Sequence, residues 1–77
     1  MASSRKQFLQ ELINQHNPAI SNTDAQDVAL AAKISLDEGE SHAKQLEEEG
    51  YLQTVGLGGN IAPTEKGRKA ADDPRWV

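Results

Sequence analysis

The chain has 77 residues, a formal net charge of −4 and no cysteine. This length fits one small domain, and the lack of cysteine excludes a disulfide framework and a thiolate metal site. No apolar run is long enough to cross a bilayer. No apolar signal segment follows the first six residues, and Ala2 is not the glycine of a myristoylation site. We therefore expect one cytoplasmic domain, residues 1–77, without a membrane partner.

The first predicted helix is Ser4–His16. Its first residue, with Gln7 three positions later, forms a capping-box pattern. An apolar stripe at helical spacing follows, which consists of Phe8, Leu9, Leu12 and Ile13. The pair Asn17-Pro18 ends the helix, because the residue before a proline avoids helical geometry. Ile20 in the next loop is expected to insert into the core.

A second helix is predicted after the polar loop, where Thr23 with Gln26 forms another capping-box pattern. Its buried side is predicted to consist of Val28, Leu30, Ala31 and Ile34. Ser35–Asp37 is predicted to be a turn. Within that turn we expect Leu36 to point inward and Asp37 to cap the next helix, which gives two short helices in close succession.

The third helix is predicted to follow Asp37 and to stop at Gly50, since glycine commonly stands just past a helix. Ala43 and Leu46 are predicted to form its inner face. Residues 37–50 contain six acids and one base, so this segment carries −5 and the rest of the chain +1. The macrodipole favours some of this charge near the helix N-terminus. Nearly all the net acidity therefore belongs to one helix.

The next segment predicts a β-hairpin. Tyr51–Val55 alternates as a strand, and Ile61–Pro63 returns as a second short strand. Between them, Leu57–Ile61 is predicted to be the hairpin tip, because its glycines and asparagine tolerate positive φ. Pro63 suits the end or the edge of a strand, where no ladder hydrogen bond is lost.

A last short helix is predicted from Glu65 to about Ala71, with Thr64 as its cap. The motif Asp72–Pro74 is expected to stop this helix. Two alternatives stay open for residues 72–77: they fray as a tail, or they dock Trp76 on the body of the domain.

Three parts of this series, taken together, resemble winged helix-turn-helix proteins, in particular the multiple-antibiotic-resistance regulators of bacteria and archaea. They are Leu30–Asp37, Leu46–Leu52 and Ile61–Arg68. They match that family's leucine-alanine helix with its leucine-serine turn, its glutamate-rich helix end before glycine, and its threonine-x-x-glycine after the wing. The resemblance implies an α+β winged helix: a three-helix core with a helix-turn-helix, a two-stranded β wing and a short C-terminal helix.

The resemblance also implies a transcriptional regulator that binds DNA. The family's base-contacting positions fall on Asp37, Glu38, Glu40, Ser41, Lys44 and Gln45. Phosphate contacts are expected from Asn60 at the wing tip and from Lys66, Arg68 and Lys69. Those three bases equally fit a solvated helix face. Gly39 replaces a usual apolar residue, and the family's long dimerisation helices have no counterpart. The oligomeric state therefore stays open, a homodimer included.

The charge of the third helix favours a different partner. DNA affinity comes largely from lysine and arginine that neutralise phosphates, and clustered acids at the leading edge of a helix repel them. The competing hypothesis is a protein-interaction or adaptor module that meets a basic partner surface. Its contact face would consist of Glu38, Glu40, Ser41 and Lys44. Sequence leaves the two hypotheses near parity, with the resemblance favouring DNA.

An enzyme is not predicted, and neither is a cofactor or a metal. The two histidines, His16 and His42, lie in different predicted helices. His42 and its neighbour Ser41 point about 100° apart on a helix and form no nucleophile–base pair. Gly56–Ile61 lacks the last glycine of a dinucleotide fingerprint and stands in no βαβ unit. The sequence therefore predicts a non-catalytic binding module.

Overall fold

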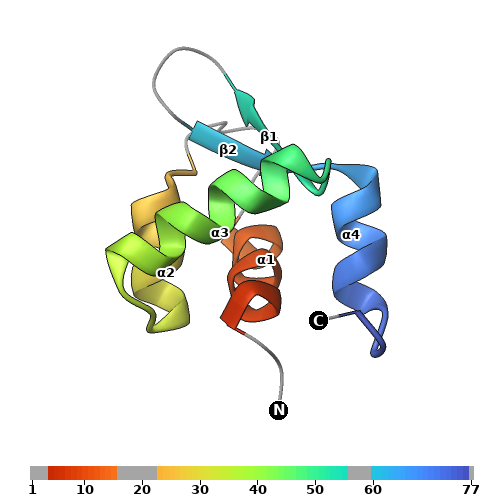
Figure 1. Ribbon diagram of the computed structural model, residues 1–77, viewed down its shortest axis with the longest axis horizontal. Coiled ribbons are helices and arrows are strands. Elements are labelled where there is room, and N and C mark those ends of the chain that lie inside the picture. Colours follow the sequence, from red (N-terminus) through yellow and green to blue (C-terminus); the bar gives the residue numbers. More distant parts are fainter. Residues whose placement is uncertain (1–3, 16–22, 56–59, 77) are drawn as a thin grey trace.

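The computed structural model describes residues 4–15, 23–55 and 60–76. In chain order this part of the molecule forms α1 (Ser4–Gln15), α2 (Ala25–Ala32), α3 (Leu36–Glu48), β1 (Leu52–Val55), β2 (Asn60–Pro63) and α4 (Glu65–Asp72). Figure 1 shows α1 in the middle, α2 and α4 on either side, and α3 with the hairpin across them. The predicted α+β class is confirmed, and the layout is compatible with a winged helix.

The predicted hairpin strands are confirmed. β1 and β2 pair antiparallel, with Leu52 opposite Pro63 and Val55 opposite Asn60. Asn60, predicted at the wing tip, opens β2 and is half-buried. The other predictions for the tip, residues 57–59, lie outside the described residues. So do those for residues 16–20. Among the helices that are described, none combines the length and the apolar character needed to span a bilayer.

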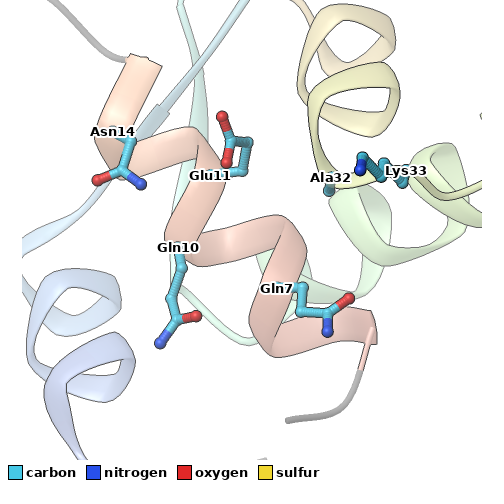
Figure 2. Close-up of a pocket in the computed structure, with 6 residues that line it drawn as sticks. All are labelled: Gln7, Gln10, Glu11, Asn14, Ala32 and Lys33. Carbon is cyan, nitrogen blue, oxygen red and sulfur yellow. The ribbon is translucent and has the colours of Figure 1, made fainter.

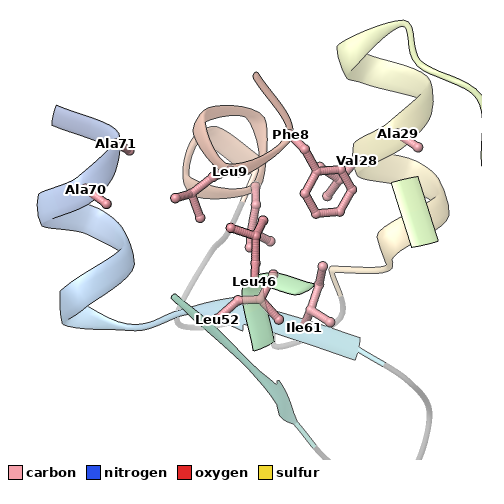
Figure 3. Packing of buried hydrophobic residues seen from close by; sticks show 10 residues of the cluster. Phe8, Leu9, Val28, Ala29, Leu46, Leu52, Ile61, Ala70 and Ala71 are labelled. Atoms are coloured by element: carbon pink, nitrogen blue, oxygen red, sulfur yellow. The ribbon is translucent and has the colours of Figure 1, made fainter. Parts of the chain in front are cut away.

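The core forms where α1 meets α2, α3, β2 and α4 (Figure 3). The buried hydrophobic residues are Phe8, Leu9, Leu12, Val28, Ala29, Leu46, Leu52, Ile61, Ala62, Ala70 and Ala71. Ile13, Ala43 and Ile34 pack against this cluster from its margin. The apolar stripe predicted for α1 and the inner face predicted for α3 are thus confirmed.

The face that α2 turns to the core differs from the prediction. Val28 and Ala29 are fully buried, whereas Leu30 is 66% exposed and Ala31 is exposed too. Successive helix residues rotate by about 100°, so the two residues that follow Ala29 turn toward solvent. The prediction that Leu30 and Ala31 are buried was therefore wrong.

The residues before α2 join the hairpin. Asp24 forms an isolated antiparallel bridge with Asn60, and the Ile61 amide donates to the Thr23 carbonyl at 2.8 Å. This pairing buries Thr23. The predicted cap is therefore corrected: Asp24 caps α2, and its carboxylate accepts a hydrogen bond from the Gln26 amide at 2.9 Å. β2 thus has β1 along one edge and the start of α2 along the other.

α3 begins earlier than predicted. Ser35, in extended geometry, caps it and accepts a hydrogen bond from the Glu38 amide at 3.1 Å. Serine is a favoured cap because its hydroxyl satisfies a free amide of the first turn. Asp37 consequently lies inside that first turn and is not the cap. Leu36 is the first helical residue and is 44% exposed, so the expectation that it points inward was also wrong.

α2 and α3 end in the same Schellman hydrogen-bond pattern. After α3, the amides of Gly50 and Tyr51 donate to carbonyls one turn back, and Gly50 has a φ of 84°. This confirms Gly50 as the predicted stop. After α2, the amides of Lys33 and Ile34 do the same, and Lys33 has a φ of 61°. Glycine adopts positive φ freely, whereas lysine does so at a cost.

α2 and α3 approach closely at Gly39. A Cβ at this position would lie 2.5 Å from the Cβ of Ala29 and 3.6 Å from a ring atom of Phe8. Real Cβ atoms do not approach one another this closely, so the crossing requires a residue without a side chain. The apolar residue that the resembling family carries here would not fit. Gly39 therefore allows the first half of α3 to pack directly against α2.

Thr64, which precedes α4, and Trp76, which follows it, contact the residues just after the C-terminal end of α3. The Thr64 hydroxyl accepts a hydrogen bond from the Gly67 amide at 3.1 Å and donates to the Gly50 carbonyl at 2.6 Å. Thr64 is thus confirmed as the cap of α4. The Trp76 ring packs against Tyr51 with centroids 5.1 Å apart in an edge-on arrangement. Of the two alternatives for the tail, docking of Trp76 is the one observed.

Candidate macromolecule-binding surface

The structure divides the predicted contact residues between two places. On α3 lie Glu38, Glu40, Ser41, Lys44 and Gln45. On α4 lie Lys66, Arg68 and Lys69. Figure 1 shows α4 beside the C-terminal end of α3, with α2 beside its N-terminal half. Asn60 belongs to neither group, because it bridges to Asp24 at the start of β2. The predicted residues thus lie on three elements, α3, β2 and α4.

The side of α3 that faces away from the core is exposed along the helix. We call it the outer face of α3. It consists of Asp37, Glu40, Ser41, Lys44, Gln45 and Glu48, all of them exposed. Among the described residues, none of its three acids has a cationic nitrogen within 4.0 Å. The outer face is therefore acidic, with Lys44 as its only base.

Several bases are already engaged inside the fold. The guanidinium of Arg5 lies 2.9 Å from the Glu49 carboxylate and 4.9 Å from the centroid of the Trp76 ring. The ammonium group of Lys6 is buried and donates to the Asp73 carbonyl at 2.8 Å. These two basic side chains thus contribute to the contacts between the N- and C-terminal segments.

The bases of α4 are also partly occupied. Lys66 donates to the Glu49 carbonyl at 2.8 Å and lies 4.7 Å from the centre of the Tyr51 ring, so it caps the C-terminal end of α3. Lys69 lies 3.5 Å from Glu65 in an exposed pair, a kind of contact that contributes little stability. Within the described part of the chain, Arg68 has neither an ion pair nor burial. One of the three predicted phosphate contacts is therefore used internally.

A contact between α1 and α3 was not predicted from the sequence. The Ser4 hydroxyl lies 2.9 Å from Nε2 of His42, and the Glu38 carboxylate lies 4.0 Å from the same nitrogen. Nδ1 of His42 is buried without a hydrogen-bond partner among the described residues. In a serine–histidine–acid triad the carboxylate orients the other ring nitrogen. This cluster lacks that arrangement and instead ties α1 to α3.

An open hollow of about 460 Å³ lies between α1 and the end of α2 (Figure 2). It is lined by Gln7, Gln10, Glu11, Asn14, Ala32 and Lys33. Ligand pockets are mostly apolar with a few convergent polar groups, whereas this lining is dominated by amides on an exposed helix side. The structure also brings no three metal-ligating side chains together within its described residues. The outer face of α3 remains the strongest candidate surface.

Comparison of the chain with models of known protein families, with curated proteins and with solved structures found no match. The resemblance to winged-helix regulators therefore rests on the sequence pattern, and the order of elements is compatible with it.

Proposed function

We propose that this protein is a non-catalytic winged-helix module that binds a basic surface of another protein through the outer face of α3. One observation carries the proposal. Asp37, Glu40 and Glu48 lie exposed on that face without a cationic partner among the described residues, while Arg5 and Lys66 are bonded elsewhere in the fold. The acidity of the outer face is thus available to a partner, whereas Arg5 and Lys66 are already engaged within the fold.

The winged-helix part of the proposal is supported by the order and pairing of the elements. α2 and α3 are joined by a short turn, an antiparallel hairpin follows, and the residues before α2 bridge to β2. The protein-binding part is supported by electrostatics. A negative helix face repels a phosphate backbone, whereas it steers encounter with a basic protein surface and helps to select that partner.

The proposal is tested by measuring two affinities side by side at low salt: for a fluorescent oligolysine peptide and for a mixed-sequence DNA duplex. We expect binding of the peptide and none of the duplex. The variant Asp37→Asn, Glu40→Gln, Glu48→Gln should weaken peptide binding by about tenfold. The control Glu65→Gln removes an exposed acid from α4 and should leave the affinity unchanged. Binding of the duplex alone would overturn the proposal.

DNA binding is the second candidate function. It is favoured by Lys44 in the middle of the outer face and by the exposed guanidinium of Arg68. On this hypothesis Lys44 and Gln45 approach the groove, and α4 contributes phosphate contacts. Changing Glu38 and Glu40 to glutamine should then strengthen duplex binding severalfold, because two repulsive charges are removed. An unchanged affinity would show that α3 does not dock on the duplex.

A further inference from the structure

We infer that the partner presents a basic amphipathic helix, which seats its apolar side on Leu30 and Leu36 and sets its lysines or arginines against the neighbouring acids. This inference rests on the proposed function and adds the chemistry of the partner. Leu30 and Leu36, 66% and 44% exposed, are the large hydrophobic side chains left open to solvent in the part of the chain that the structure describes.

The two leucines lie close to one point of the fold. Leu30 follows Ala29 directly, and Leu36 stands one helical turn before Gly39. α2 and α3 approach closely at Ala29 and Gly39, since a Cβ on the glycine would meet that of the alanine at 2.5 Å. Each leucine is therefore within one turn of the helix crossing, beside the short turn that joins α2 to α3.

Neither exposed leucine is explained by the packing of the domain itself. The core contacts of α2 come from Val28 and Ala29, and those of α3 come chiefly from Leu46. Exposed apolar groups scattered singly are ordinary on a protein surface. Two leucines that flank the same turn, while the other large hydrophobic side chains of the described residues are at least partly buried, instead mark a place where a partner removes apolar surface from water.

The charges around these leucines select the partner. Asp27 lies three positions before Leu30 on α2, and Glu40 lies four positions after Leu36 on α3, so each leucine shares a helix side with an acid. Asp37 follows Leu36 directly. Among the described residues of α2, the turn and the first turns of α3, Lys33 is the one base, so this surface remains negative. An apolar anchor ringed by acids complements a helix with apolar residues at every third and fourth position and basic residues between them.

The experiment uses two fluorescent peptides of equal length. One has leucines at every third and fourth position and lysines elsewhere; the other is oligolysine. We expect the leucine–lysine peptide to bind more tightly. The double variant Leu30→Ser, Leu36→Ser should lower its affinity by about tenfold and leave oligolysine binding unchanged. The matched control is Ala31→Ser, an exposed neighbour on α2. Circular dichroism verifies that each variant is folded.

The other outcomes separate this inference from the proposed function. If the double variant binds both peptides as the unmodified protein does, the leucines are not contacts and the inference is overturned, while the proposed function stands. If neither peptide binds the unmodified protein, both fall. Binding to anionic lipid vesicles that requires the leucines, without peptide binding, would overturn the inference by assigning the leucines to a membrane surface.

Discussion

The two ends of α3 differ in how far other parts of the fold compensate their charge. At the C-terminal end, three residues from α1 and from α4 with its cap supply hydrogen bonds or charge: Arg5 pairs with the Glu49 carboxylate, Lys66 caps the Glu49 carbonyl, and Thr64 bonds the Gly50 carbonyl. We call this the bonded end. Glu49 and the last carbonyls are thus compensated inside the molecule, and Glu48 is the acid of the outer face that remains exposed there.

The N-terminal end of α3 has the Ser35 cap and the contact of Gly39 with Ala29, but two of its exposed acids, Asp37 and Glu40, have no cation among the described residues. We call this the open end. The two ends carry similar acidity in the sequence and differ in what surrounds them. Charge that a segment carries becomes charge available for binding only where the fold does not compensate it.

The largest effect is expected at the bonded end, from Gly67→Ala. The new Cβ would lie 1.9 Å from the Tyr51 carbonyl oxygen, a backbone atom that cannot rotate away. We expect the free energy of unfolding, measured in urea, to fall by about 3 kcal/mol. The neighbouring control Arg68→Ala changes an exposed residue and should stay within about 0.5 kcal/mol. A loss for the glycine variant no larger than the control's would contradict this close approach.

The corresponding change at the open end, Gly39→Ala, should cost less. The Cβ would clash with the Ala29 methyl group, while alanine gains about 1 kcal/mol of helix propensity over glycine. We expect a net loss of about 1 kcal/mol in urea unfolding. The pair Ala29→Gly, Gly39→Ala should be more stable than the two single losses added together, since it relieves the clash. Additive losses would show that these residues do not touch.

The two helix ends with positive φ offer a smaller test. Lys33→Gly should raise the free energy of unfolding by about 0.5 kcal/mol, because relief of the left-handed conformation exceeds the added entropy of the unfolded chain. The opposite change at the end of α3, Gly50→Ala, should lower the free energy of unfolding by about 1 kcal/mol, because alanine adopts positive φ at a cost. Thermal unfolding of both variants checks the pair. Two changes of the same sign would argue against a positive φ at both positions.

The smallest effect on stability comes from single charges. Glu49→Gln breaks the ion pair with Arg5 and should lower the free energy of unfolding by about 0.5 kcal/mol at low salt, and by less at high salt. Glu40→Gln, at the open end, should cause no loss, because that carboxylate has no cationic partner among the described residues. Urea unfolding at two salt concentrations distinguishes them. Equal losses would remove the contrast between the ends.

Local sequence signals predicted much of the fold. The stripe of α1, the Thr64 cap, the Gly50 stop and the two hairpin strands each depend on a few adjacent residues, and the structure confirms them. The buried side predicted for α2 was confirmed for Val28 and wrong for Leu30, which is as apolar as a core residue. The exposure of Leu30 goes with the contact between Ala29 and Gly39, a tertiary contact between two helices that the pattern of α2 alone does not reveal.

The candidate surface was predicted only in part. The residues assigned to α3 do share one helix, because helical spacing is a local property. The roles of the bases could not be predicted, since they depend on tertiary neighbours. The hydrogen bond from Lys66 to Glu49 spans 17 positions and the pair of Arg5 with Glu49 spans 44. No pattern of nearby residues marks either contact.

The edge-on pair of Trp76 and Tyr51 gives this protein an intrinsic fluorescence probe of its C-terminal segment. The chain contains one tryptophan and one tyrosine, and their rings lie 5.1 Å apart in the folded molecule. Light absorbed by the tyrosine should therefore be re-emitted by the tryptophan until the C-terminal segment detaches. Because the pair lies at the bonded end of α3, this emission should change when the C-terminal segment detaches or the protein unfolds. It should not change when a partner binds near Leu36.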